Sequence, residues 1–144
     1  MSWLVDTDIL SERTKATPNS RVVGWLRDNA DSIYTSSHVV GEIAAGIERL
    51  SGRRKVALQE WLQRLIKSLE GRILNFNDTV ALVWAQQEAE YERLGCAMPM
   101  PDSFIAATAR RYNLTIVTRN VADYQRPGLR VFNPFTPSAS SRTA

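Results

Sequence analysis

The stretch Met1-Ser2-Trp3-Leu4-Val5-Asp6-Thr7-Asp8-Ile9-Leu10 decides the fold of this chain. Its apolar run from Trp3 to Val5 is short and bounded by polar residues, which is typical of a strand buried on both faces of a parallel sheet. The run stops at Asp6, and in open α/β sheets ligands bind beside the carboxyl ends of the strands. Asp6 is therefore a candidate site residue. It is equally well placed to cap the following helix, because aspartate is a favoured N-cap residue.

Strand-like and helix-like stretches alternate along the rest of the chain. Further strands are predicted where β-branched or apolar residues run together, at 33–36, 72–76, 115–118 and 129–132. Helices are predicted where apolar residues recur at helical spacing, at 22–30, 38–50, 53–69, 78–94 and 102–109. This alternation predicts a three-layer α/β/α domain with a mostly parallel sheet of about five strands.

The chain is 144 residues long, which is enough for one domain with a substantial core. We expect that domain at residues 1–135, followed by a disordered tail at 136–144 that is rich in Ser, Thr and other small residues. No stretch approaches the roughly 20 apolar residues of a membrane span, and the N-terminus has no secretory pattern. A single cysteine, Cys96, agrees with a reducing compartment, so a cytoplasmic protein without membrane contact is expected.

The residue inventory excludes several chemistries. With one histidine and one cysteine, the chain lacks the ligands for a His/Cys zinc site. A Ser-His-Asp triad would need His38 as its base, but no nucleophile-elbow motif accompanies it, so His38 is predicted to be a surface or helix-start residue. The net charge of +3 and the pI near 9.3 give modest support for a polyanionic partner such as nucleic acid.

A helix is predicted to begin at Asp102, directly after the connector Met98-Pro99-Met100-Pro101. Each proline biases the residue before it away from helix, so the connector is expected to be rigid and extended. Ile105, Ala106 and Ala109 stand three, four and seven positions after Asp102, which places its carboxylate on the buried, small-residue face. Helix capping would also explain Asp102, but capping does not require small residues that bring helix and sheet close.

Other polar side chains are predicted at the same edge of the sheet. Asp6 follows the first strand, and Asn120 and Asp123 follow the fourth. Glu42 lies on the helix after the second strand, where on its own it would be read as a solvated charge. Together with Asp102 these carboxylates form a hard oxygen-ligand site without histidine or cysteine, which suits Mg²⁺ or Mn²⁺.

Four segments resemble, in order, the motifs of PIN-domain ribonucleases, and most closely those of the VapC toxins of bacterial type II toxin–antitoxin systems. They are Val5-Asp6-Thr7-Asp8-Ile9-Leu10, Val40-Gly41-Glu42-Ile43, Pro101-Asp102-Ser103-Phe104-Ile105-Ala106-Ala107-Thr108-Ala109 and Thr118-Arg119-Asn120-Val121-Ala122-Asp123-Tyr124. The resemblance spans Trp3 to Phe135 and implies a PIN-like nuclease fold. It also implies Mg²⁺-dependent RNA cleavage, with Mn²⁺ as a substitute, by a quartet of acidic residues.

Asp6, Glu42 and Asp102 match three members of that quartet. The fourth position departs from the pattern, because Asn120 stands where many members of the family carry an acid. Asp123 follows three residues later, so the sequence leaves open which of the two side chains completes the site.

The resemblance further implies an RNA substrate, a cognate VapB-like antitoxin and a homodimer, with DNA contacted only through the antitoxin. The predicted helices 38–50 and 53–69 should form a hairpin, beside which such toxins hold the antitoxin tail in a groove. The expected contact residues are basic and apolar residues of the second helix, namely Arg53, Arg54, Trp61, Leu62 and Leu65. The alternative is that this apolar stripe is ordinary core, since amphipathic helices usually face the core.

Two other functions compete with this expectation. Asp6-Thr7-Asp8 resembles the nucleophile motif of haloacid-dehalogenase-like phosphotransferases, but Leu10 replaces the Thr or Val of that motif. Its later paired aspartates and catalytic lysine are also missing. A catalytically silent PIN module that only binds RNA or a partner is the second alternative, against which the three intact carboxylates argue. Metal-dependent RNA cleavage separates both alternatives from a nuclease.

Overall fold

A computed structural model describes residues 1–137 of the chain. Its centre is a five-stranded sheet in the order β3-β2-β1-β4-β5. The strands are β1 (Trp3–Val5), β2 (Ile33–Ser36), β3 (Ile73–Leu74), β4 (Thr115–Val117) and β5 (Val131–Phe132). Every pairing is parallel, so the carboxyl ends of all strands lie along one edge of the sheet.

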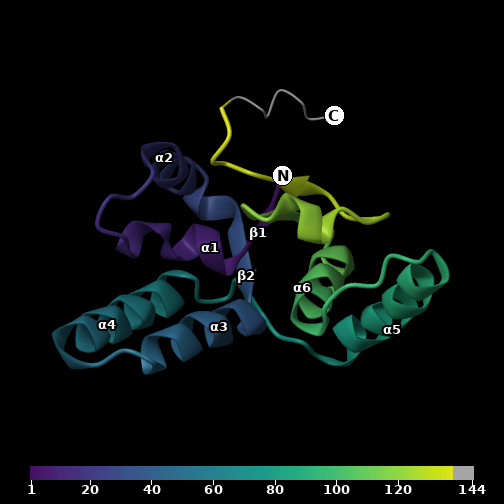
Figure 1. Ribbon diagram of the computed structural model, residues 1–144, viewed down its shortest axis with the longest axis horizontal. Coiled ribbons are helices and arrows are strands. Elements are labelled where there is room, and N and C mark those ends of the chain that lie inside the picture. The colour runs from purple at the N-terminus through teal and green to yellow at the C-terminus, as the bar shows by residue number, and fades with distance from the viewer. Residues whose placement is uncertain (138–144) are drawn as a thin grey trace.

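Helices cover both faces of this sheet, which confirms the predicted three-layer α/β/α architecture (Figure 1). On one side lie α1 (Thr7–Leu10), α2 (Ser20–Asp28), α3 (Ser37–Glu48) and α4 (Gly52–Ser68). On the other side lie α5 (Asp78–Arg93) and α6 (Met100–Arg111). Short 3₁₀ segments are η1 (Ser11–Thr14), η2 (Ala30–Ser32) and η3 (Val121–Tyr124). The helices α3 and α4 pack against each other as the predicted hairpin.

Polar side chains fix where three of the helices begin. Asn19, Ser36 and Asn77 accept hydrogen bonds from backbone N–H groups in the first turns of α2, α3 and α5. Because the first N–H groups of a helix have no partner inside it, each such cap contributes about 1 kcal/mol to stability.

The start of α6 differs from the prediction. The helix begins at Met100, so the expectation of an extended connector through Pro101 and a helix start at Asp102 is wrong by two residues. Pro101 is tolerated in the first turn because the N–H that proline lacks would have no helical partner there. Asp102 is therefore not the N-cap. It lies inside the first turn, where the positive end of the helix dipole still favours a carboxylate.

The two edge strands are shorter than predicted. β3 and β5 have two residues each, within the predicted stretches 72–76 and 129–132. Each pairs with only one neighbour, β2 or β4, so fewer backbone hydrogen bonds define its length. The expected tail begins at Thr136, and its residues from 138 onward lie outside the described part of the chain.

The core surrounds β1 and β4. Leu4, Val5, Ile116 and Val117 are completely buried, and so is Ala106 of α6. Small residues on that helix allow its backbone to lie close to the sheet, as the sequence predicted, and this places the first turn of α6 beside the carboxyl ends of the strands. Within residues 1–137, the helices are too short or too polar to cross a membrane.

Candidate functional site

Asp6 lies at the carboxyl end of the central strand, β1, with only 8% of its surface exposed. Its Oδ1 atom accepts a hydrogen bond of 2.8 Å from the Thr7 N–H, and its Oδ2 atom accepts one of 3.0 Å from the Thr118 hydroxyl. The first of these contacts makes Asp6 the N-cap of α1. Asp6 is thus both a helix cap and a side chain of the edge where the strands end.

Glu42 reaches the same place from α3. The Thr7 hydroxyl donates a hydrogen bond of 2.7 Å to Glu42 Oε1. Thr7 therefore connects the turn after β1 with the helix that follows β2. Glu42 is exposed, and within the described residues its second carboxylate oxygen, Oε2, has no hydrogen-bond partner.

Asp102 approaches this edge from the first turn of α6 and is half-buried. The Tyr124 hydroxyl lies 3.4 Å from Asp102 Oδ1 and donates a long hydrogen bond to it. Tyr124 belongs to η3, which follows β4, and is 1% exposed. The segment after β4 and the start of α6 therefore meet beside Asp6 and Glu42.

The charge of Glu42 acts on both Asp6 and Asp102. Burial raises the pKa of Asp6 from 3.8 to about 6, and the charges of Asp8 and Glu42 add to this effect against the hydrogen bonds from Thr7 and Thr118. Burial also raises the pKa of Asp102, to which the charges of Asp123 and Glu42 contribute. Burial is the larger cause of both raised pKa values, and repulsion between like charges adds to it.

Tyr124 lies among these carboxylates. Its pKa is raised first by burial and then by the charges of Asp6, Asp102 and Glu42. A side chain that senses all three carboxylates lies between the elements that carry them, namely β1, α3 and α6. The structure therefore brings Asp6, Glu42 and Asp102 together, as their places in the sequence predicted.

The two candidates for the fourth position are both exposed and lie at or within η3. The charge of Asp123 raises the pKa of Asp102, which places Asp123 within electrostatic range of the site. The backbone N–H of Asn120 donates a hydrogen bond of 3.2 Å to the Thr118 hydroxyl, the same hydroxyl that contacts Asp6. Both candidates therefore stay next to the carboxylates, and the geometry does not choose between them.

The oxygen donors of Asp6, Glu42 and Asp102 are of the kind that binds a hard divalent cation, although the three carboxylates lie farther apart than ligands of one bound ion. In residues 1–137 no three acidic, histidine or cysteine side chains stand close enough together to hold a metal ion. None of the ion pairs in that part of the chain involves Asp6, Glu42 or Asp102. The charge of Arg126 acts on Asp102 without forming an ion pair with it. Carboxylates that repel each other outside ion pairs attract a cation, and oxygen-only donors favour Mg²⁺ or Mn²⁺.

Three hydroxyl residues of the site were missed in the sequence. Thr7, Thr118 and Tyr124 each donate a hydrogen bond to one carboxylate, namely Glu42, Asp6 and Asp102 respectively. All three lie inside the segments that resemble family motifs. Their closeness in sequence to the acids was the feature that could have marked them as site residues. Asp8 has a different part, because its Oδ2 accepts the Arg119 N–H at 2.9 Å and so links α1 to the loop after β4.

His38 lies in the first turn of α3, in agreement with its prediction as a helix-start residue. Its ring packs against Phe104 at 4.7 Å and against Phe76 at 5.8 Å between centroids. These aromatic contacts give His38 a packing role between α3 and α6.

The predicted partner-binding residues of α4 fall into three groups. Arg53 and Arg54 are exposed, Trp61 and Leu65 are half-buried, and Leu62 is buried with 7% exposure. Leu62 also lines a small groove between α3 and α4, about 240 Å³ in volume, together with Ala44, Ile47, Glu48, Gln59 and Gln63. Leu62 therefore belongs to the core and to the floor of this groove, and Trp61 and Leu65 pack at the border of the core.

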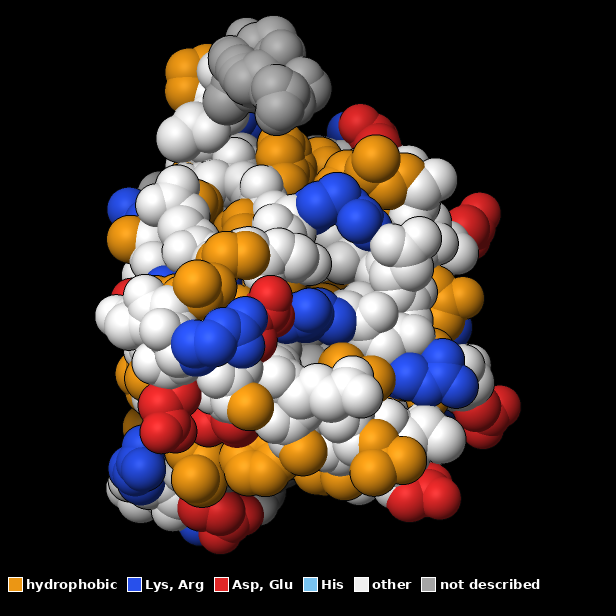
Figure 2. Space-filling view, turned by 90° about the vertical axis from the view of Figure 1, so that its right-hand side faces the viewer, with side chains coloured by type: hydrophobic (Ala, Val, Ile, Leu, Met, Phe, Trp, Pro, Cys, Tyr) orange, Lys and Arg blue, Asp and Glu red, His pale blue; other side chains and the backbone are white. Residues whose placement is uncertain are grey.

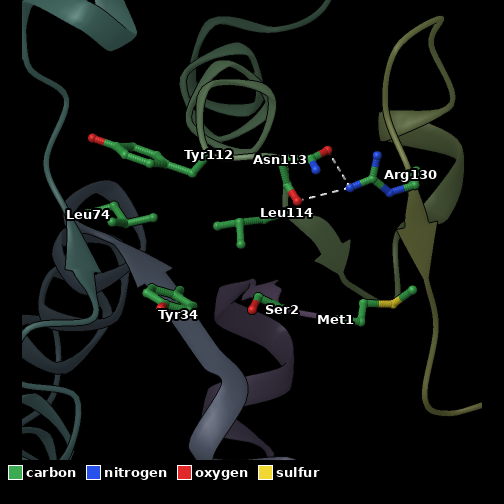
Figure 3. A pocket seen from close by; sticks show the side chains of 8 residues that line it. All are labelled: Met1, Ser2, Tyr34, Leu74, Tyr112, Asn113, Leu114 and Arg130. Atoms are coloured by element: carbon green, nitrogen blue, oxygen red, sulfur yellow. Dashed lines mark hydrogen bonds between the residues drawn. The ribbon is translucent and has the colours of Figure 1, made fainter.

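A larger cavity of about 670 Å³ opens at the opposite, amino-terminal edge of the sheet (Figure 3). Tyr34, Leu74, Tyr112 and Leu114 form its walls, and Arg130 stands at its rim. Arg130 is held there by hydrogen bonds to the Asn113 side chain and backbone. None of the predicted site residues lines this cavity. The carboxylate site is therefore a separate place from this larger cavity.

Known proteins share both the sequence and the fold. A model of the PIN domain family matches residues 3–126. The toxin FitB of Neisseria gonorrhoeae is 36% identical over 135 residues, which cover 92% of this chain and 97% of FitB. The VapC ribonuclease Y4jK of Sinorhizobium fredii is 28% identical over 138 residues, which cover 94% of this chain and 99% of the relative.

A solved structure of FitAB bound to an IR36 DNA fragment contains a chain that superimposes on this one with a TM-score of 0.86. The two chains are 33% identical, and the match covers 92% of this chain and 95% of the other. The family match spans all four of the segments that carry the resemblance in the sequence. The chain belongs to the PIN domain family, with the toxin FitB and a VapC ribonuclease among its relatives.

Proposed function

We propose that this protein is a Mg²⁺-dependent endoribonuclease and the toxin of a bacterial toxin–antitoxin pair. The observation that carries the proposal is the convergence of Asp6, Glu42 and Asp102 at the carboxyl edge of a PIN-domain sheet, with none of the three in an ion pair within the described residues. Relatives over nearly the whole chain that are named as a toxin and as a ribonuclease support it.

The chain's own residues suit this chemistry. Asp6 is the rigid ligand, because both of its oxygens are fixed by hydrogen bonds. Glu42 and Asp102 each have one oxygen held by a hydroxyl group, which leaves the other oxygen to turn toward a cation. A bound Mg²⁺ supplies charge neutralisation, polarisation of the phosphodiester and a lower pKa for water, and Mn²⁺ can replace it. Glu42 would hold the cation together with Asp6 and Asp102, aided by Asn120 or Asp123.

Cleavage of RNA by the purified chain tests this proposal. Wild-type protein should cleave single-stranded RNA with Mg²⁺ or Mn²⁺ and lose cleavage in the presence of EDTA. Asp6→Asn keeps the size of the side chain but removes its charge, so it should abolish cleavage while the circular dichroism spectrum stays unchanged. In cells, expression of the wild type should stop growth and expression of Asp6→Asn should not. Cleavage by Asp6→Asn at the wild-type rate would remove Asp6 from the site.

The same assay decides between the alternatives. A catalytically silent PIN module would bind RNA and leave it intact under every metal condition. A phosphotransferase would release phosphate from small phosphate esters. Membership of the PIN family favours a nuclease, and so do the charges of Asp6, Glu42 and Asp102, from three separate segments, that all act on Tyr124.

We further propose that a separate antitoxin chain of the VapB type neutralises this protein in the cytoplasm and binds along the α3–α4 hairpin. The groove beside Leu62 offers an apolar floor with a rim of glutamines and Glu48. A basic side chain of the antitoxin that reached the carboxylates would replace the charge of the metal and block the site at once. The similar FitAB assembly has been solved bound to a DNA fragment, and we propose that DNA contact here runs through the antitoxin alone.

Substitutions on α4 test the antitoxin surface. Trp61→Gln combined with Leu65→Gln should weaken antitoxin binding by roughly tenfold or more, because half-buried aromatic residues dominate interfaces. RNA cleavage by the free toxin should remain. Val56→Gln on the same helix is the matched control, since Val56 is already 53% exposed and outside the groove. Unchanged affinity of the double variant would contradict the proposed surface.

A homodimer is the last part of the proposal. Exposed apolar side chains gather on the face that carries α5 and the start of α6, where Figure 2 shows a band of hydrophobic side chains between charged ones. Leu82 is 69% exposed, Leu94 is 52% exposed and Met100 is 57% exposed. Large exposed apolar side chains often mark protein–protein contacts, so we place the dimer contact on α5, where Leu82 is the most exposed leucine.

A further inference from the structure

We propose that Tyr124 is a positioning residue that fixes the Asp102 carboxylate for cation binding. The inference rests on the metal site of the proposed function. Tyr124 is 1% exposed, and its hydroxyl donates to Asp102 Oδ1 over 3.4 Å. Within residues 1–137 the structure gives this hydroxyl no other hydrogen-bond partner. Because a buried hydroxyl needs a partner, the contact with Asp102 is the one that satisfies it.

The surroundings of the Tyr124 hydroxyl favour a role as hydrogen-bond donor. Besides Asp102, the negative charges of Asp6 and Glu42 act on Tyr124. Carboxylates only accept hydrogen bonds, so a phenol placed among them serves as a donor. A donor at Oδ1 of Asp102 turns the carboxylate plane and leaves Oδ2 free for a cation.

The other two carboxylates are held in the same manner. The Thr118 hydroxyl lies 3.0 Å from Asp6 Oδ2, and the Thr7 hydroxyl lies 2.7 Å from Glu42 Oε1. Residues that hydrogen-bond to metal ligands orient them, and their loss typically lowers metal affinity or activity by roughly 10- to 100-fold. At 3.4 Å the Tyr124 contact is the longest of the three. Hydrogen bonds at such sites often tighten when the site is filled, so we expect the Tyr124 contact to shorten on cation binding.

The position of Tyr124 is itself fixed from two sides. Its ring is part of the hydrophobic core. Two residues later, Arg126 donates hydrogen bonds of 2.6 Å to the Cys96 carbonyl and 3.2 Å to the Ala97 carbonyl. Arg126 thus clamps the segment that carries Tyr124 to the loop that leads into α6 and Asp102. The two ends of the Tyr124–Asp102 contact are therefore held relative to each other.

Direct binding of Mn²⁺ to the full-length chain tests the inference without any RNA. Tyr124→Phe keeps the ring in the core and removes the donor, so it should weaken Mn²⁺ binding roughly tenfold in calorimetric titrations. The matched control is Tyr91→Phe. Tyr91 is also fully buried, and its hydroxyl donates 2.6 Å to the Pro127 carbonyl, but the charges that act on it are those of Arg110, Glu90 and Cys96. This control should keep the wild-type Mn²⁺ affinity.

A second variant guards against a general folding defect. Arg126→Lys keeps the positive charge that acts on Asp102 but cannot reproduce the forked hydrogen bonds to the Cys96 and Ala97 carbonyls, so it loosens the clamp and should weaken Mn²⁺ binding in the same direction as Tyr124→Phe. Metal-free melting temperatures of all variants show whether the fold is kept. Equal Mn²⁺ affinity in Tyr124→Phe and wild type would overturn the inference, and so would an equal loss in Tyr91→Phe. Both results would leave the proposed nuclease standing, whereas wild-type protein that binds no Mn²⁺ would overturn the metal site and this inference together.

Discussion

Asp6 is both a helix cap and a candidate ligand. Its Oδ1 accepts the Thr7 N–H and so caps α1, and its Oδ2 accepts the Thr118 hydroxyl, so both oxygens fix the carboxylate at the end of β1. Burial of a charge is unfavourable, and the hydrogen bonds from Thr7 and Thr118 offset only part of this cost, so the pKa of Asp6 stays raised. A residue kept at a cost to stability is typical of a functional site.

Substitution of this aspartate should therefore change the pH dependence of stability. The folded-state pKa of about 6 lies above the ordinary value of 3.8, so the stability linked to Asp6 is fully present below pH 3.8 and is lost as the pH rises to 6. Two pKa units correspond to about 3 kcal/mol as an upper value. Asp6→Asn should abolish this loss and be more stable than wild type at pH 7.5, as measured by urea unfolding at pH 4.5 and 7.5 without metal. A variant that keeps the wild-type pH slope would contradict the assignment.

Among single residues, the sequence predicted the candidate carboxylates but not the hydroxyl groups that donate hydrogen bonds to them. Asp6, Glu42 and Asp102 were singled out together, by their predicted places at one edge of the sheet and by the resemblance to PIN-domain motifs, since each acid alone has an ordinary structural explanation. The hydroxyls of Thr7 and Tyr124 carry no such signal, because Thr and Tyr are common at strand ends and in cores. Which atom each hydroxyl reaches depends on how the chain segments cross, and spacing along one segment does not contain that information.

The sequence also predicted some strands and helices more accurately than others. The central strand β1 was predicted at its observed bounds, because three apolar residues between polar ones allow little else. The edge strand β3 and the start of α6 were predicted less well. Pairing with a single neighbour decides the length of β3, and prolines, which normally end helices, are accepted in the first turn of α6. Both outcomes depend on neighbours in space.

The close approach of α6 to the sheet gives a test at the scale of elements. Ala106 is completely buried, so Ala106→Leu adds three carbon atoms where there is no room. Overpacking of this kind should lower the free energy of unfolding by about 1–3 kcal/mol. It should also impair RNA cleavage, since it pushes the start of α6 and Asp102 away from Asp6. Ala89→Leu on the exposed face of α5 is the control, and equal unfolding free energies for the two variants would refute close packing at Ala106.

The proposed dimer contact on α5 is tested by its most exposed leucine. Leu82→Asp should give a monomer in light scattering at concentrations where wild type is a dimer, because a charge on each copy would meet its counterpart in the contact. The fold should remain, since exposed substitutions change stability by about 0.5 kcal/mol or less. Val56→Asp, on the opposite side of the sheet at α4, should leave the dimer intact. A wild-type monomer would exclude the homodimer altogether.

In the whole molecule, the strand order creates the site. β1 lies between β2 and β4, so Asp6, the helix that follows β2 and the segment that follows β4 all start from neighbouring positions along one edge. Alternating strands and helices predict a parallel sheet and hence a shared edge. They do not predict the order of the strands, because several orders satisfy the same alternation. The convergence of the acids was therefore a hypothesis until the order was known.

Cation binding should couple this edge to the stability of the entire domain. Without metal, the charges of Asp123 and Glu42 repel Asp102 and raise its pKa, after the larger effect of burial, so Asp102→Asn should leave the metal-free protein as stable as wild type or more stable. A ligand that binds only the folded state adds stability with its concentration, about 2.7 kcal/mol at 100 times Kd. Mn²⁺ should therefore raise the melting temperature of wild type, and Asp102→Asn should blunt this rise. Glu92→Gln, on the exposed face of α5, is the charge-matched control and should respond like wild type. Thermal unfolding in EDTA and in Mn²⁺ measures all three proteins, and an equal response of Asp102→Asn and wild type would remove Asp102 from the cation site.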